Sequence, residues 1–86
     1  MSFSLQFRAS AEKELKRLPD PVLVRVDAAL LKLAENPYAC AIKKLKNHPG
    51  YRMRAGDYRI LFEISSKEGI ISISAIRHRR EAYRKK

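Results

Sequence analysis

Arginines in one short apolar segment are the residues of this sequence best suited to chemistry. Residues 51–60 read YRMRAGDYRI and contain Arg52, Arg54 and Arg59. Apolar and aromatic residues alternate with these arginines, which is typical of a strand with one buried face. Gly56 and Asp57 suit a two-residue hairpin loop, which would set Arg54 directly opposite Arg59. Opposed side chains lie about 4.5–5.5 Å apart at Cβ, so these like charges repel unless an anion lies between them.

A phosphate group would satisfy this arrangement. Each guanidinium is a planar fork of donors that can bind two oxygens, and several of them around one centre would neutralise a dianionic phosphorane. A simpler alternative is that the arginines keep an exposed strand soluble and pair with Glu63 or Asp57. The opposition of Arg54 and Arg59 favours the anion site.

The overall composition also favours an anionic partner. The chain has 86 residues, with 19 Lys and Arg against 9 Asp and Glu, for a formal net charge of +10. Such a charge attracts nucleic acid, an anionic membrane or an acidic protein. The length suits a single domain over residues 1–86.

Features of membrane and secreted proteins are not expected here. No apolar run approaches the roughly 18–20 residues needed to span a membrane, and the first residues do not resemble a secretory signal. The single cysteine, Cys40, cannot form an internal disulfide. We therefore expect a cytoplasmic protein without a membrane partner.

The first half of the chain is expected to form a strand and two helices. Alternating apolar residues in 3–7 indicate an N-terminal strand. One helix should begin at Ser10, its expected N-cap, and end at Pro19, and a second should span 20–36. The two would form an antiparallel helical hairpin. The apolar stripe of the second helix is predicted to comprise Val22, Leu23, Val26, Ala29, Leu30, Leu31, Leu33 and Ala34.

The second half is expected to form a three-stranded antiparallel meander. Its strands should span 51–55, 58–65 and 70–76, and the basic connector before them gives only a weak pattern for a further strand over 41–45. The fold class is therefore α+β, with the helices packed on one face of the sheet. In the expected register Ala75 faces the core, and Ile76 lies on the polar face with the arginines.

Further candidates follow the last predicted strand, where the chain reads IRHRREAYRKK. If the strand continues past Ile76, His78 points to the same face as Arg59. A histidine could pass a proton there, although a surface or capping role is an alternative. Tyr83 could stack on a nucleobase or anchor this segment against the sheet.

Over essentially its whole length the sequence resembles the RelE/ParE superfamily of small bacterial and archaeal toxins. The resemblance rests on the order of elements, on YRMRAGDYRI at 51–60 and on HRREAYR at 78–84. The chain is most similar to the RelE type, a ribosome-dependent mRNA endonuclease that cuts in the ribosomal A site. The resemblance thus implies a RelE-like fold and a metal-free, cofactor-free cleavage in which the 2′-hydroxyl of the RNA attacks the neighbouring phosphate.

The resemblance also implies roles for individual residues. Arg52 and Arg54 match two basic residues of a family strand, and Arg59 matches the arginine of a Tyr-Arg pair. Arg79 matches a basic residue after the last strand, and Tyr83 matches a tyrosine that stacks on the mRNA base.

The proton acceptor is the open question in this set. Several relatives carry lysine at positions 52 and 54, whereas arginine stays protonated and cannot act as a base. His78 is therefore favoured, with Lys46 and Tyr83 as alternatives. The predicted catalytic residues are Arg52, Arg54, Arg59, His78, Arg79 and Tyr83, and the residues predicted to bind RNA or the ribosome are Lys43, Lys44, Lys46, Arg77, Arg80 and Arg84.

The partners that the resemblance implies are the ribosome, mRNA and an acidic antitoxin that wraps the toxin. Promoter DNA would be bound only indirectly, through the antitoxin complex. Two other functions stay open: a ParE-type inhibitor of DNA gyrase with the same fold, and a basic nucleic-acid-binding module without chemistry.

Overall fold

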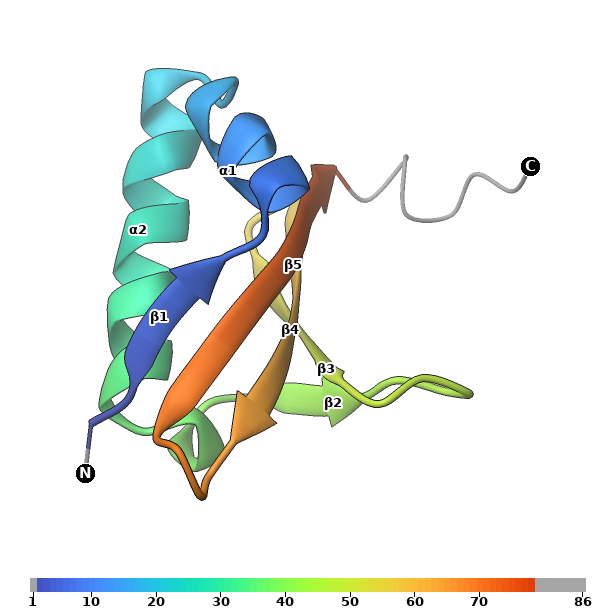
Figure 1. Cartoon of the computed structure of the whole chain (residues 1–86). Coiled ribbons are helices and arrows are strands. Elements are labelled where there is room, and N and C mark those ends of the chain that lie inside the picture. The colour runs from blue at the N-terminus through green and yellow to red at the C-terminus, as the bar shows by residue number, and fades with distance from the viewer. Residues whose placement is uncertain (1, 79–86) are drawn as a thin grey trace.

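The computed structural model describes residues 2–78, which form a mixed sheet with helices packed on one of its faces (Figure 1). In chain order the elements are β1 (Ser4–Phe7), α1 (Ala9–Lys16), α2 (Asp20–Glu35), the 3-10 helix η1 (Pro37–Ala39), β2 (Ile42–Lys44), β3 (Tyr51–Ala55), β4 (Tyr58–Ser65) and β5 (Ile70–His78). Neither α1 nor α2 is long and apolar enough to cross a membrane. The α+β class, with its helical hairpin on one side of the sheet, is confirmed.

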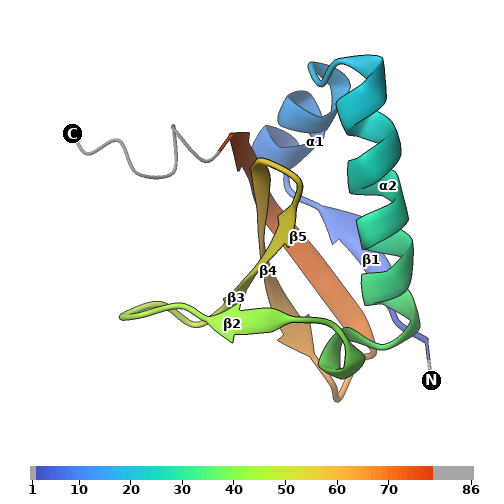
Figure 2. The same cartoon turned by 180° about the vertical axis from the view of Figure 1, so that it is seen from behind.

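The sheet has five strands in the order β1-β5-β4-β3-β2. β1 runs parallel to β5, and all other neighbours are antiparallel. β3, β4 and β5 form the predicted meander, and the weakly indicated strand of the connector exists as β2, which pairs with β3. Seen from behind, α2 runs along the same face of the sheet as α1 (Figure 2).

The β3–β4 hairpin has the register that its sequence predicts. Ala55 pairs with Tyr58, and Arg54 pairs with Arg59 on the next rung. Gly56 begins the turn with a φ of 64°, a left-handed conformation that a side chain would disfavour. The turn therefore fixes two arginines directly opposite each other.

The β4–β5 hairpin departs from its predicted register. Phe62 pairs with Ile73 as expected, but the neighbouring Leu61 pairs with Ala75, so Ser74 is an extra residue in β5. The Ser74 hydroxyl donates a hydrogen bond to the Leu61 carbonyl oxygen at 3.1 Å. Side chains alternate along a strand, so one extra residue reverses the facing of the residues that follow it.

This bulge corrects the predictions for the end of β5. Ile76, expected on the polar face, lies in the core with 2% of its surface exposed. Arg77 pairs with Arg59, whereas His78 pairs with Tyr58. The prediction that His78 points to the same face as Arg59 is therefore wrong, and Arg77 takes that place.

The core lies between the helices and the sheet. Its fully buried large side chains include Val26, Leu33, Ile60, Phe62, Ile71 and Ile73. The predicted apolar stripe of α2 is wrong at Leu31, which is 68% exposed. Leu31 follows the buried Leu30 by one residue, which is about 100° around the helix and carries it to the outer side.

α1 covers the part of the β5 edge that extends beyond β1. The Ser10 hydroxyl donates to the Ser74 carbonyl oxygen at 3.3 Å, and the Ile76 N–H donates to Glu14 Oε1 at 2.7 Å. These contacts supply partners for backbone groups that an exposed strand edge leaves open. The prediction that Ser10 is the N-cap of this helix is wrong, because Arg8 occupies the N-cap position and Ser10 lies inside α1.

Candidate functional site

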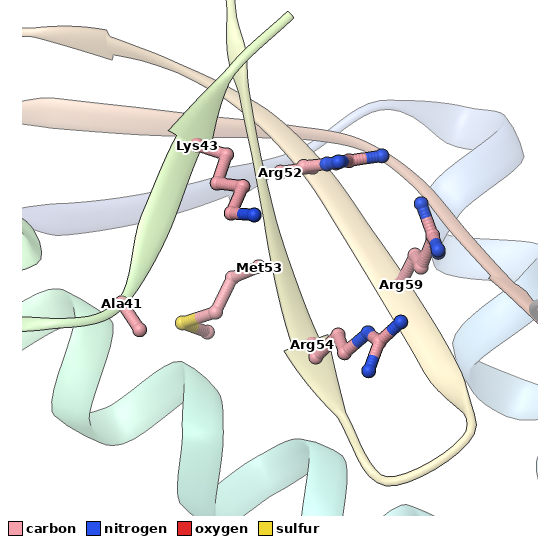
Figure 3. Close-up of a pocket in the computed structure, with 6 residues that line it drawn as sticks. All are labelled: Ala41, Lys43, Arg52, Met53, Arg54 and Arg59. Atoms are coloured by element: carbon pink, nitrogen blue, oxygen red, sulfur yellow. The ribbon is translucent and has the colours of Figure 1, made fainter.

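The predicted arginines of β3 and β4 line one concave pocket, here named the arginine pocket (Figure 3). Its cavity volume is about 320 Å³, and its lining residues are Ala41, Lys43, Arg52, Met53, Arg54 and Arg59. In Figure 3 the guanidinium groups of Arg52 and Arg54 extend to the side on which that of Arg59 lies. Among the described residues, the lining includes cations and apolar groups but no carboxylate. The pocket therefore favours an anion.

The arginines of the pocket differ in exposure. Arg59 is 6% exposed, Arg52 is half-buried and Arg54 is exposed. Within residues 2–78, Arg59 is the charged residue that falls in the buried class. Water screens a buried charge less than an exposed one, so Arg59 acts more strongly on an anion held beside it. Arg54 is exposed, so its side chain can change conformation to fit a bound ligand.

Lys43 joins this pocket because β2 exists. It pairs with Arg52 across β2 and β3, and its side chain lies at the margin of the pocket in Figure 3. Lys44 pairs with Tyr51 and borders a separate shallow pocket with Glu63. The sequence marked these lysines only as general RNA-binding cations, since the weak strand pattern gave no register for them.

Arg77 pairs with Arg59 in the sheet but does not line the pocket. Its Nε lies 3.4 Å from Glu14 Oε2, and the other oxygen of the same carboxylate accepts the Ile76 N–H. Sequence reasoning missed Glu14, because its contacts depend on how α1 docks against β5. Glu14 orients Arg77 and compensates part of its charge beside Arg59.

His78 lies on the other face of the sheet from Arg59. Its ring meets that of Tyr58 edge-on, with centroids 5.2 Å apart and planes at 86°. His78 is not among the residues that line the arginine pocket. Proton transfer by His78 into that pocket would need a rearrangement of this ring pair.

The other predicted site residues lie outside the pocket or outside the described part of the chain. Lys46 is exposed in the loop after β2. The predictions for Arg79, Arg80, Tyr83 and Arg84 concern positions beyond residue 78, which the structure does not describe. Within residues 2–78, no group of three or more His, Cys, Asp or Glu side chains could hold a metal ion.

Comparison with known proteins gives a match over most of the chain. Residues 5–83 match the family model described as the ParE toxin of the type II toxin–antitoxin system parDE. A comparison with curated protein sequences gives no match.

Solved structures with the same fold include several toxin–antitoxin complexes. One is the RelBE2 complex from Mycobacterium tuberculosis, with a TM-score of 0.81 at 23% identity, covering 91% of this chain and 99% of that chain. The RelE–RelB complex from Pyrococcus horikoshii OT3 gives 0.78 at 25% identity, covering 92% and 97%. The RelB–RelE complex from Methanococcus jannaschii gives 0.72 at 28% identity, covering 91% and 94%. With the family match over residues 5–83 and this shared fold, the chain belongs to the ParE toxin family of type II toxin–antitoxin systems, within the RelE/ParE superfamily.

Proposed function

We propose that this chain is the toxin of a type II toxin–antitoxin pair and that it cleaves mRNA in the ribosomal A site. The observation that carries the proposal is the arginine pocket, whose described lining joins three arginines and one lysine without a carboxylate. The family match and the fold shared with RelE toxins support the toxin class. Gyrase inhibition would not require a pocket of this composition.

The chemistry proposed is attack by the RNA 2′-hydroxyl on the adjacent phosphate. The bond from phosphorus to the 2′-oxygen forms, the bond to the 5′-oxygen breaks, and a cyclic phosphate remains. Arg54 and Arg59 would stabilise the charge that develops on the phosphorane, and Arg52 would hold a non-bridging oxygen. This route needs no metal ion.

Lys43 is the pocket residue proposed to donate a proton to the departing 5′-oxygen. Arginine stays protonated in proteins, so the guanidinium groups beside it are poor proton donors and cannot be bases. The 2′-hydroxyl proton would pass to water. His78 was the acceptor favoured from the sequence, and its contact with Tyr58 speaks against that role.

The remaining cations are proposed to bind the ribosome and its message. Lys44, the last residue of β2, and Lys46, in the loop after it, are exposed and would contact RNA phosphates. Arg77 would bind RNA more weakly than these lysines, because its ion pair with Glu14 compensates part of its charge. For the segment beyond residue 78, we propose leaving-group stabilisation by Arg79, base stacking by Tyr83 and phosphate contacts by Arg80 and Arg84.

The proposed partners are the ribosome with its mRNA and an acidic antitoxin that neutralises the toxin. The structures matched above contain such pairs of toxin and antitoxin. Promoter DNA would be contacted only through that complex, and the ribosome sets the cytoplasm as the place of action.

The test is cleavage of a defined message on purified ribosomes. The wild-type chain should cut the A-site codon and leave a 2′,3′-cyclic phosphate. Arg54→Ala should reduce the single-turnover rate about 10²–10³-fold, the loss typical for removing one donor to a developing oxyanion. Arg54 is exposed, so the fold should persist. Arg17→Ala is the matched control and should cut normally, because Arg17 is an exposed arginine at the C-cap of α1 and does not line the pocket.

The ParE name of the matching family model supports one second candidate, inhibition of DNA gyrase. A supercoiling assay with purified gyrase separates the two. Inhibition of supercoiling by the wild-type chain, together with intact messages on ribosomes, would replace the nuclease proposal by the gyrase one.

A further inference from the structure

A second hollow, here named the Glu63 hollow, lies beside the arginine pocket on the same face of the sheet. Its volume is about 220 Å³, and its lining includes Leu45, His48, Pro49, Leu61, Glu63 and Ser74. Leu61 pairs with Arg52 and follows Arg59 by two positions in β4. Residues two positions apart in a strand share a face and lie about 7 Å apart. The two hollows are therefore neighbours, and an RNA strand with a phosphate in the arginine pocket can place a flanking base in the Glu63 hollow.

One wall of the Glu63 hollow is the loop between β2 and β3, which projects from the sheet on the side away from the helices (Figure 2). The Leu45 N–H donates to the Gly50 carbonyl oxygen at 3.0 Å and closes the neck of this loop. Gly50 lets the loop return close to β4, since a Cβ there would lie 3.0 Å from the Phe62 carbonyl oxygen. The loop thus brings the His48 imidazole to the edge of the apolar floor that Leu45 and Leu61 form.

The polar side chains that the sheet contributes to the hollow are acceptors of hydrogen bonds. Glu63 is the one acidic residue of the five described strands, and within residues 2–78 it takes part in no ion pair. The Ser74 hydroxyl hydrogen is already donated to the Leu61 carbonyl oxygen, which leaves the Ser74 oxygen as an acceptor. A carboxylate repels phosphate but accepts hydrogen bonds from the amino groups of nucleobases. The Glu63 hollow therefore favours a base over a phosphate.

Guanine matches this lining best among the RNA bases. Its N1–H and N2–H₂ are adjacent donors, and the two oxygens of one carboxylate can accept from both. Cytosine and adenine each offer one amino group, whereas uracil has a carbonyl oxygen on either side of its N–H, and these oxygens repel a carboxylate. The apolar floor and the imidazole of His48 can contact the face of any base. Discrimination between bases therefore depends on Glu63.

We propose that the Glu63 hollow binds a base next to the scissile phosphate and that Glu63 selects bases with an amino group, guanine before cytosine and adenine, against uracil. This inference rests on the proposed function for the identity of the substrate as RNA. The arginines of the neighbouring pocket would bind phosphate without regard to sequence, since every nucleotide carries one. Glu63 is thus the specificity-determining residue of this face, and its contribution is to the choice of message rather than to the chemical step.

The first experiment varies the two bases that flank the cut, one at a time, in messages on purified ribosomes. At one of these positions the wild-type chain should cut the guanine message with a kcat/KM about 10-fold above that for the uracil message. Glu63→Gln should reduce this ratio below about 3-fold, because its amide can also donate to the carbonyl oxygens of uracil. Glu63 is exposed, so folding should be retained. An equal change for all four bases would show that Glu63 acts only through its charge and would overturn the proposal.

The matched control is Glu68→Gln, the same change at an exposed acid in the turn between β4 and β5, outside the hollow. It should leave the ratio of guanine to uracil cutting at the wild-type value. If Glu68→Gln shifts this ratio as far as Glu63→Gln does, the effect comes from net charge and the inference fails.

A second pair of variants tests the wall of the hollow. His48 is exposed, and His48→Ala removes the ring on which a base would stack, so KM should rise about 10-fold for every message while the preference for guanine persists. His48→Phe keeps a ring and should restore the wild-type KM. If His48→Ala leaves KM unchanged, no base is held against the loop and the proposal fails.

Binding without cleavage separates this inference from the proposed function. The purified chain is titrated into a labelled short oligouridine and into the same oligomer with one central guanine, both 2′-O-methylated so that no 2′-hydroxyl can attack. Fluorescence anisotropy should show about 10-fold tighter binding of the guanine oligomer to wild type, and less than about 3-fold to Glu63→Gln. If the wild-type chain cuts no message but this difference holds, the nuclease proposal fails and the base site stands. If messages are cut and Glu63→Gln changes neither preference, the base site fails and the nuclease proposal stands.

Discussion

The two hairpins of the sheet share β4, but different forces set their registers. In the β3–β4 hairpin the turn at Gly56 is enough, and Arg54 falls opposite Arg59. In the β4–β5 hairpin the pairing shifts at Ser74, and the last rungs are held by Glu14, which lies 62 positions before Ile76 in the chain. The register of the β3–β4 hairpin places Arg54 beside Arg59 in the arginine pocket. The register of the β4–β5 hairpin, whose end contacts α1 through Glu14, places His78 on the other face of the sheet.

The sharpest way to break this comparison is to replace one candidate for proton transfer on each side: Lys43, the proposed donor in the pocket, and His78, the acceptor favoured from the sequence. Lys43→Arg keeps the charge at the margin of the pocket but gives up an ammonium that can donate a proton. We expect it to slow single-turnover cleavage on ribosomes about 10²-fold, the lower end for a general acid. His78 lies after the bulge, on the face of the sheet opposite to Arg59. His78→Gln should change the rate less than about 3-fold, since the His78 ring contacts Tyr58 and does not line the pocket.

A message with sulfur in place of the scissile 5′-oxygen provides the control. A thiolate leaves without a proton, so the Lys43→Arg defect should largely vanish on that substrate, whereas the Arg54→Ala defect should remain. If Lys43→Arg cuts the ordinary message like wild type, Lys43 contributes charge only. A large loss in His78→Gln would restore the histidine to the mechanism and show that the end of β5 turns over in the ribosome.

The same contrast explains which features the sequence could predict. Alternation, turn chemistry and helix periodicity were sufficient for the two helices, β3, β4 and the opposition of Arg54 to Arg59, because each depends on residues close in sequence. The bulge could not be read, because Ser74 is a polar residue in an ordinary alternating pattern and its hydroxyl finds Leu61 only in the folded sheet. The position of Lys43 in the pocket could not be predicted either. It depends on the pairing of β2 with β3, and β2 has only three residues, too few for their pattern to give a register.

Substitution of Glu14 tests, through stability, how much its contact with the end of β5 contributes to the β4–β5 register. Glu14→Ala leaves the part-buried Ile76 N–H without its acceptor and should lower the free energy of unfolding by about 1–3 kcal/mol in urea titrations. Glu14→Gln keeps an acceptor oxygen and should lose less. The ion pair with Arg77 adds little, because the Arg77 side chain is 49% exposed. Glu12→Ala, an exposed acid on the same helix, should stay within about 0.5 kcal/mol of wild type.

Cleavage by the Glu14 variants, corrected for the folded fraction, should match wild type, because the β3–β4 turn and the pairing of β2 with β3 position the pocket residues, and the end of β5 supplies none of them. A loss of cleavage without a loss of stability would mean instead that the end of β5 shapes the pocket. Equal stability of Glu14→Ala and wild type would show that water or another group replaces the carboxylate at Ile76.

The smallest expected effect is on thermal stability, when alanine replaces the glycine in the turn of each hairpin. Gly56 and Gly69 have φ of 64° and 69°, so alanine at either position costs about 1 kcal/mol of backbone strain. A Cβ at Gly69 would meet nothing within 4 Å, whereas one at Gly56 would lie 3.3 Å from a guanidinium nitrogen of Arg25, the movable end of a long side chain. Thermal unfolding should therefore show similar losses, slightly larger at Gly56. Cleavage distinguishes them further: if strain at Gly56 shifts the hairpin by one residue, Arg54 leaves Arg59 and the rate falls as far as in Arg54→Ala, an outcome that Gly69→Ala cannot produce because its turn carries no pocket residue.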